Sequence, residues 1–164
     1  MNGSCGYHLV GYDSPLGIKT ISVVPFVEEE PLGLSADLTA ALCERLASEG
    51  LILTTNRAEA DGVVVGRVYD ARSASSASNT RQIQVFQLIA KVEAQLKDKR
   101  GQKVWSKTIT LEESFLPYKQ GGANGALGTD ANRRLALRRF AKEAARRLHS
   151  AFVIDRVVRP MEES

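Results

Sequence analysis

The sequence predicts an α+β domain, a two-layer sandwich in which a mixed sheet of four or five strands carries two helices on one face. Segments rich in β-branched residues recur along the chain, and two long alternating segments flank a short polar turn. Two further segments place apolar residues at helical spacing. Because 164 residues can bury one core, we expect a single domain over residues 5–155 and a tail over residues 156–164.

Residues 18–50 predict the first strand and the first helix. Residues 18–26 are rich in β-branched side chains, and Pro25 marks the end of this strand or a position at the sheet edge. The acidic residues 28–30 indicate a solvated loop, because three adjacent carboxylates cannot converge on a metal without further ligands. Ser35 is the expected N-cap of the helix, and Gly50 ends it. Its apolar face comprises Leu38, Leu42, Cys43, Leu46 and Ala47.

The middle of the chain predicts four strands. Residues 51–55 form the first, and the valine-rich residues 62–69 indicate a central strand that is buried on both sides. The polar, low-complexity residues 71–80 favour a mobile hairpin loop. The next strand covers residues 82–96, with a bulge or a bend expected near Val85 and Phe86. After a turn at 97–102, residues 103–115 return antiparallel, with Trp105, Ile109 and Leu111 alternating.

A glycine-rich stretch, residues 118–128, precedes the last helix. It lacks the G-x-G-x-x-G and Gly-Lys-Ser/Thr patterns that bind phosphate, so we expect a flexible connection. Thr129 or Asp130 should cap the helix, and residues from Val153 onward should form a tail. The apolar face of the helix comprises Leu137, Phe140, Ala141, Ala144, Ala145, Leu148, Ala151 and Phe152. Arg138, Arg139, Lys142 and Arg146 cover the opposite side and are expected to be a solvated face or a contact surface for acidic lipid or a partner.

The composition narrows the classes of function. No apolar run approaches the ~20 residues of a membrane-spanning helix, and a net charge of +3 is compatible with an anionic partner or with none. The two histidines, His8 and His149, lie far apart in sequence, and no metalloprotease, nucleophile-elbow or C-x-x-C motif is present. Glu112 and Glu113 are neighbours on a strand and point to opposite faces. We therefore predict no enzyme, no cofactor and no metal site, and basic residues without interleaved aromatics argue against nucleic acid.

The N-terminal residues carry a resemblance to a known family. Residues 5–11 read Cys-Gly-Tyr-His-Leu-Val-Gly, and later landmarks follow in the order that the family shows. These landmarks are residues 16–21, 25–26, 38–42 and 58–66, the pair Val104-Trp105, and Asn132 in the last helix. Together they resemble the lipopolysaccharide-assembly lipoproteins called LptE, over about the whole chain.

This resemblance implies a function without chemistry. Members of the family are non-enzymatic outer-membrane lipoproteins that plug and help assemble the LptD β-barrel, which delivers lipopolysaccharide to the cell surface. Cys5 would be the site of lipid attachment and would hold the protein at the periplasmic side of the outer membrane. Residues 1–4 would then be a remnant of a precursor or of cloning. The alternative is that Cys5 is an incidental thiol at the chain terminus, or that it pairs with Cys43 in an oxidising compartment.

Three basic residues are candidates for binding the phosphates of lipopolysaccharide. Arg72, Arg81 and Lys119 flank the loops before and after the two long strands. If these loops lie at the same end of the sheet, their side chains would converge on phosphate groups.

Two other functions stay open at this point. The stretch over residues 60–66 is similar to a strand in periplasmic lipoproteins that regulate a cell-wall enzyme or a secretion assembly. A lipid-binding module that acts without any barrel is the third possibility.

Overall fold

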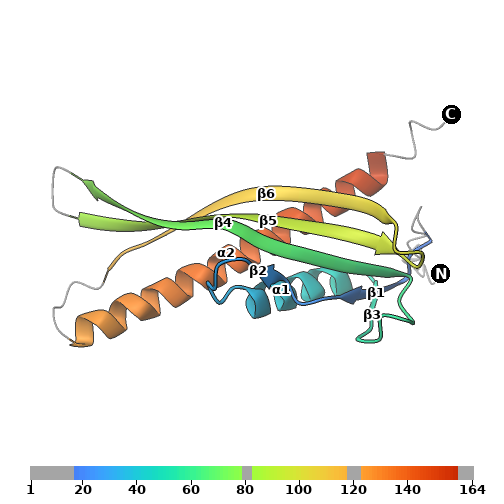
Figure 1. Cartoon of the computed structure of the whole chain (residues 1–164), viewed down its shortest axis with the longest axis horizontal. Coiled ribbons are helices and arrows are strands. Elements are labelled where there is room, and N and C mark those ends of the chain that lie inside the picture. The colour runs from blue at the N-terminus through green and yellow to red at the C-terminus, as the bar shows by residue number, and fades with distance from the viewer. Residues whose placement is uncertain (1–16, 79–82, 118–122, 159–164) are drawn as a thin grey trace, which may run out of the picture.

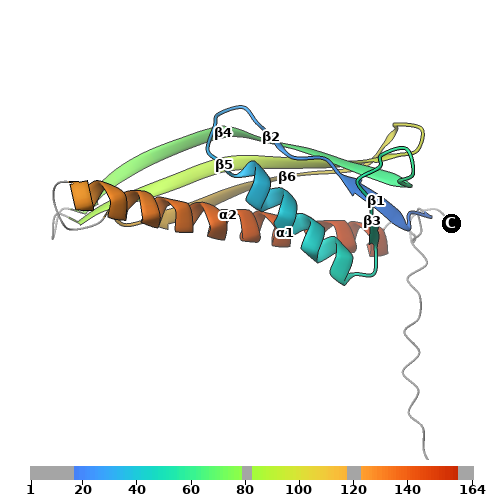
Figure 2. The same cartoon turned by 90° about the horizontal axis from the view of Figure 1, so that it is seen from below.

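The computed structural model describes residues 17–78, 83–117 and 123–158 and arranges them in two layers (Figure 1). Six strands form one mixed, open sheet, and both helices lie on the same face of it, as the view in Figure 2 shows. The predicted α+β sandwich is therefore confirmed, although the sheet has more strands than the four or five expected.

The sheet combines a parallel part with an antiparallel meander. Its strand order is β3-β1-β4-β5-β6, and β2 pairs with β4 beyond the end of β1. β1, β2 and β3 make only parallel pairs, whereas β4, β5 and β6 pair antiparallel with one another. The strands are β1 (Thr20–Val23), β2 (Val27–Glu28), β3 (Ile52–Leu53), β4 (Gly62–Ser78), β5 (Ile83–Asp98) and β6 (Lys103–Phe115).

The strand predicted over residues 18–26 is divided. β1 ends at Val23, before Pro25, and β2 starts at Val27. Proline has no N–H with which to continue the ladder, so the chain passes it before pairing resumes. At the start of β1, the Oδ2 atom of Asp61 accepts the backbone N–H groups of Lys19 and Thr20. The Oδ1 atom of Asp61 forms an ion pair with Lys99 Nζ at 2.9 Å.

The prediction of a mobile loop over residues 71–80 is wrong for the part of this segment that the structure describes. β4 continues to Ser78, and its serine-rich half pairs with β5 over residues 83–89. Backbone hydrogen bonds order this hairpin, so its polar composition does not prevent strand formation. Residues 79 and 80 lie outside the described part of the chain.

A bulge lies in β4, whereas the register with β4 does not shift near Val85 and Phe86 of β5, where a bulge or a bend was predicted. Tyr69 pairs with Lys91 and Arg72 with Ile89, so β4 contains one extra residue at this point. Asp70, within this bulge, adopts a positive φ of 53°, a left-handed conformation that some bulges contain.

Helix α1 (Ser35–Ser48) begins at the residue predicted as its cap, but the N-cap position is Leu34, and Glu28 accepts the N–H groups at this end of the helix. The Glu28 carboxylate accepts the backbone N–H groups of Leu32, Gly33, Leu34 and Ser35. The Ser35 hydroxyl instead donates to the Phe26 carbonyl at 2.6 Å. Glu28 is thus a structural residue of the acidic run and not only part of a solvated loop.

Helix α2 (Ala123–Val158) is longer than predicted at both ends. It starts before Thr129, so residues 123–128 of the glycine-rich stretch are helical, and the Thr129 hydroxyl donates to the Gly125 carbonyl inside the helix. At the other end it passes Val153, where a tail was expected. Only α2 extends beneath the distal end of the β4–β5 hairpin (Figure 2). Among the described residues, no helix combines the length and the apolar character needed to cross a membrane.

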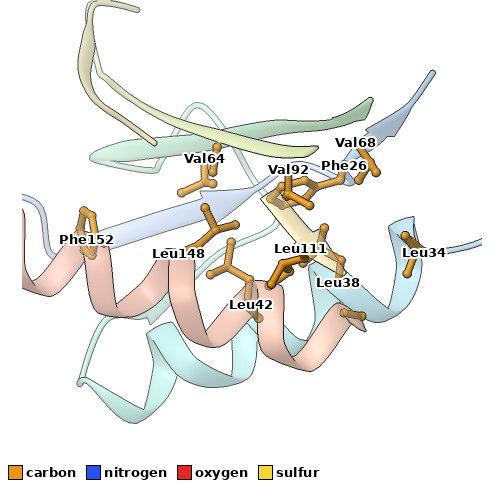
Figure 3. Close-up of a cluster of buried hydrophobic side chains, with 14 of the residues drawn as sticks. Phe26, Leu34, Leu38, Leu42, Val64, Val68, Val92, Leu111, Leu148 and Phe152 are labelled. Atoms are coloured by element: carbon orange, nitrogen blue, oxygen red, sulfur yellow. The ribbon is translucent and has the colours of Figure 1, made fainter. Parts of the chain in front are cut away.

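The core lies between the sheet and the helices. Figure 3 shows Val64 and Val92 of the sheet facing Leu42 and Leu148 of the helices. Phe140 of α2 is 1% exposed at the centre of this layer. β4 buries alternate residues only, so its valine run is central in the sheet but is not buried on both sides as predicted.

Candidate functional site

The residues predicted to bind lipid or phosphate are placed only in part. Cys5, Arg81 and Lys119 lie outside the described residues, so their roles stay predictions. Arg72 is exposed on β4, six residues before the strand ends, and therefore does not flank a loop. Its electrostatic neighbour is Lys91: the hydrogen bond to Asp70 raises the pKa of Lys91, and the charge of Arg72 opposes this rise.

The face of the sheet opposite the helices is polar and is ordered by paired side chains. Arg67 lies between two carboxylates, with Nε 2.7 Å from Glu93 and Nη1 3.2 Å from Glu29. Gln95 Nε2 donates to the second oxygen of Glu93 at 2.8 Å. These four residues come from the β2–α1 connection, β4 and β5, so the network ties three parts of the chain together across one surface.

An aromatic ring extends this network along β4. The guanidinium carbon of Arg67 lies 4.5 Å from the centroid of the Tyr69 ring, and Lys91 Nζ lies 5.7 Å from it. Such cation–π contacts fix the ring between two positive groups. Lys91 is also paired with Asp70 at 2.7 Å, which connects the ring to the bulge.

The charges of this network are set by its hydrogen bonds. The pKa of Glu93 is lowered, first by the hydrogen bond from Gln95 and then by that from Arg67. The pKa of Arg67 is raised, with the hydrogen bond to Glu93 as the largest cause. Both groups therefore stay ionised at neutral pH, and the face keeps a fixed pattern of charge.

Hydroxyl groups continue the polar surface onto β6. Residues 106, 108, 110 and 114 are serine or threonine, all are exposed, and they alternate with residues that face the helices, such as Trp105 and Leu111. We call the whole surface the uncovered face and define it by Arg67, Tyr69, Lys91, Glu93, Gln95, Ser106, Thr108, Thr110 and Ser114. A depression of about 330 Å³ at its β2 end has Val27 and Val65 among its lining residues.

A second concave feature, the distal groove, lies between the end of β6 and α2. Asn132 Nδ2 donates to the Leu116 carbonyl at 2.8 Å, and Arg139 pairs with Glu113 at 2.6 Å, so polar contacts fix α2 against the strand. The rings of Phe86 and Phe115 are stacked with their centroids 5.3 Å apart, and they join β5 to β6 at this end of the sheet. The groove has a volume of about 430 Å³ and is lined by Val85, Ser114, Phe115, Leu116, Asn132, Leu135 and Arg139.

Glu112, Glu113 and His149, the titratable residues singled out from the sequence, lie in the described part of the chain. Within these ranges, no group of three or more His, Cys, Asp or Glu side chains converges on a point where a metal could bind. Glu113 is paired with Arg139, and Glu112 is exposed beside it on the strand, so the two carboxylates do not act together. His149 is 13% exposed and lies 3.4 Å from Glu49 at the α1–α2 contact.

Sequence reasoning located the strands of the uncovered face but missed its network. The alternation of apolar and polar residues along β5 was the available signal for a polar side of the sheet. Which charges pair across it depends on contacts such as Arg67 with Glu93, 26 positions apart. Two of the α2 cations expected to be solvated, Arg139 and Arg146, are also ion-paired.

Comparison with solved structures places this fold among bacterial lipoproteins. A candidate lipoprotein from Caulobacter crescentus CB15 is 18% identical, with a TM-score of 0.61 over 84% of this chain and 91% of that one. The rare lipoprotein B of Shewanella oneidensis is 16% identical, with a TM-score of 0.53 over 84% and 96%. A minor lipoprotein of Acinetobacter baumannii is 18% identical, with a TM-score of 0.51 over 81% and 92%. At this level of identity the likeness defines the fold class.

The family follows from the sequence itself. Residues 18–152 match the profile of LptE, which is described as lipopolysaccharide-assembly. This match covers most of the chain, and the chain therefore belongs to the LptE family, as its N-terminal motif and later landmarks predicted. No curated protein matches the chain in sequence.

Proposed function

We propose that this protein is a non-enzymatic outer-membrane lipoprotein that plugs an LptD-like β-barrel and helps to assemble it for lipopolysaccharide transport. Membership of the LptE family supports the process. The observation that carries the proposal is the uncovered face, a long polar surface on one side of the sheet that no other described element covers. A surface of this kind requires an aqueous or polar neighbour.

The interior of a large membrane β-barrel offers such a neighbour. Its inward-facing residues are polar and hydrated, because only the outward face meets lipid. The ion pairs around Arg67 are formed within the protein, and the exposed hydroxyl groups of β6 can hydrogen-bond to water or to a polar wall, so contact with a wet wall requires little further desolvation. Binding by shape and hydrogen bonds, without a chemical step, is the work we assign to this face.

Two parts of the proposal concern residues outside the described ranges. Cys5 is the proposed site of acylation, which would hold the protein at the periplasmic side of the outer membrane. Arg81 and Lys119, with the exposed Arg72, are the proposed contacts for lipopolysaccharide phosphates. Reversal of charge at Arg72 and Arg81 should lower the affinity for lipopolysaccharide micelles, and unchanged affinity would remove both from the site.

Co-purification from the native envelope tests the proposed function. The acylated protein is extracted in a mild detergent, and the bound proteins are identified and quantified by mass spectrometry. We expect a large β-barrel in stoichiometric amount. A substitution of Thr108→Arg should lower its recovery, whereas Glu44→Arg, an exposed site on α1, should not. Recovery of a cell-wall enzyme or of secretion components without any barrel would favour the regulator and overturn the plug.

A further inference from the structure

Helix α2 carries more positive charge than the whole chain. It contains eight Lys and Arg side chains against three Asp and Glu, a net charge of +5, whereas the chain carries +3. The remainder of the protein is therefore negative. A charge asymmetry of this size indicates an anionic partner for the helix more strongly than a small net charge does.

Most of the described cations of α2 already have carboxylate partners. Arg134 pairs with Asp130 at 3.0 Å, and Arg139 pairs with Glu113 at 2.6 Å. Two further arginines, at 146 and 147, share the carboxylate of Glu143 at 2.7 Å, and the pKa of Glu143 is lowered to about 2 by these hydrogen bonds. These paired side chains are the standard with which the unpaired cations of α2 are compared.

Arg138 and Lys142 have no carboxylate within 4.0 Å among the described residues, although both are exposed. They are four positions apart, so they lie on one line of the helix. The same line continues toward the start of α2 through Leu135, Ala131 and Leu127 at steps of three or four residues. Leu127 is 67% exposed and Leu135 is 51% exposed. We call these five residues the α2 stripe.

The α2 stripe has an apolar half and a basic half. Exposed leucines supply the apolar contact at the core of a protein interface, and cations at its border fix orientation and speed association with an acidic partner. Leu135 also lines the distal groove, so the apolar half is continuous with a concavity of about 430 Å³. This surface has the two components of a docking site.

We propose that the α2 stripe is a docking surface for an acidic strip on a partner protein. The inference rests on the proposed function, which makes that partner the wall of the barrel. It adds that the two sides of the plug differ: the uncovered face meets a neutral polar wall, and the α2 stripe meets an acidic one. The partner is a protein and not a membrane surface, because two unpaired cations raise binding to an anionic membrane only by roughly 30-fold.

The test reverses the two charges of the α2 stripe. The double variant Arg138→Glu with Lys142→Glu is compared with wild type and with Arg57→Glu combined with Arg100→Glu. The control changes net charge equally at exposed residues whose guanidinium groups form no ion pair among the described residues. Barrel recovered by mild-detergent co-purification is measured at about 50 mM and about 500 mM salt, since surface charge effects are screened at high salt.

We expect the stripe variant to recover at least about tenfold less barrel at low salt, and the control to match wild type. Wild-type recovery should fall with salt more steeply than recovery by the variant. Arg138→Gln with Lys142→Gln should give an intermediate loss, and it replaces the reversed variant if circular dichroism shows that the latter is unfolded. Equal recovery by wild type and either stripe variant overturns the inference.

Two further outcomes separate this inference from the proposed function. If wild type recovers no barrel at either salt concentration, the plug itself fails, and the stripe loses its partner. A sedimentation assay with vesicles containing about 30% anionic phospholipid is the second arm. Binding that depends on Arg138 and Lys142 in this assay, with barrel recovery unaffected by them, would make the stripe a lipid surface and overturn the proposal.

Discussion

The two faces of the β4–β5–β6 meander are made by alternate residues of the same strands, yet they differ in almost every property. The covered face buries Val64, Val92 and Leu96 against the helices. The uncovered face presents Arg67 and Glu93 in an ordered, exposed network. Because side chains alternate along each strand, one register places the buried residues on one face and the polar residues on the other.

The covered face should dominate the free energy of unfolding. Phe140→Ala removes a side chain of α2 that is 1% exposed in the hydrophobic core. We expect a loss of about 3–5 kcal/mol, from lost burial together with the cavity left behind. Urea unfolding followed by circular dichroism measures it. The matched control Leu127→Ala, at a site on the same helix that is 67% exposed, should cost less than about 1 kcal/mol.

A substitution at Gly66 tests how closely the segment before β2 approaches β4 on the covered face. A Cβ at this position would lie 2.2 Å from Cε1 of the Phe26 ring, which is itself 2% exposed. Gly66→Ala should therefore destabilise the fold by about 1–3 kcal/mol through overpacking. Phe26→Leu in the same chain should restore part of the loss, as a double-mutant cycle would reveal. If the losses of stability caused by Gly66→Ala and Phe26→Leu were additive, contact with the Phe26 ring would not be the cause of the loss at Gly66.

His149 should make the contact between the two helices sensitive to pH. Burial lowers its pKa from 6.5, and the opposing effect of Glu49 exceeds the smaller repulsion from Arg45. The apolar sheet residues Ile21, Val64 and Leu96 surround the same site. The unfolded chain therefore binds a proton first as pH falls below about 6.5, and stability decreases from there until the folded form is protonated.

The measurement for His149 is the urea midpoint at about pH 7.5 and about pH 5.5. Wild type should lose stability between these values, and His149→Gln should lose less, whatever its stability at the higher pH. A slope that is the same in both proteins would show that other groups cause the pH dependence.

The fold was predicted from the sequence where a residue's environment follows from its neighbours along the chain. Trp105, Ile109 and Leu111 alternate in β6, and their spacing identified the strand. The serine-rich residues 71–78 failed this reasoning because their order comes from backbone bonds to β5. The glycines of residues 123–128 each cost a helix about 1 kcal/mol, but this segment continues a long helix that is fixed to β6 through Asn132.

The site was less predictable than the fold. Glu28 accepts backbone N–H groups four to seven residues later, a spacing that no simple capping pattern contains. The pair Arg67–Glu93 joins two strands, so it follows only from their register. Only the structure shows that Arg138 and Lys142 lack the carboxylate partners that other cations of α2 have.

The uncovered face should show the smallest effect on stability. Arg67→Ala removes two exposed ion pairs and a cation–π contact. Surface pairs of this kind contribute little, so we expect a loss below about 1 kcal/mol in the same urea assay. A loss as large as that of Phe140→Ala would contradict the claim that the uncovered face contributes little to the free energy of unfolding.

The central claim is that the uncovered face meets the wall of a β-barrel, and photocrosslinking in intact cells tests it most directly. A photoreactive amino acid at Thr108, opposite Glu93 in the strand register, should capture one large β-barrel protein on illumination. The same probe at Trp105, which is 7% exposed on the covered face, should capture nothing. A barrel adduct specific to position 108 supports the account, whereas adducts with other proteins, or no adduct in cells that contain the barrel, would contradict it.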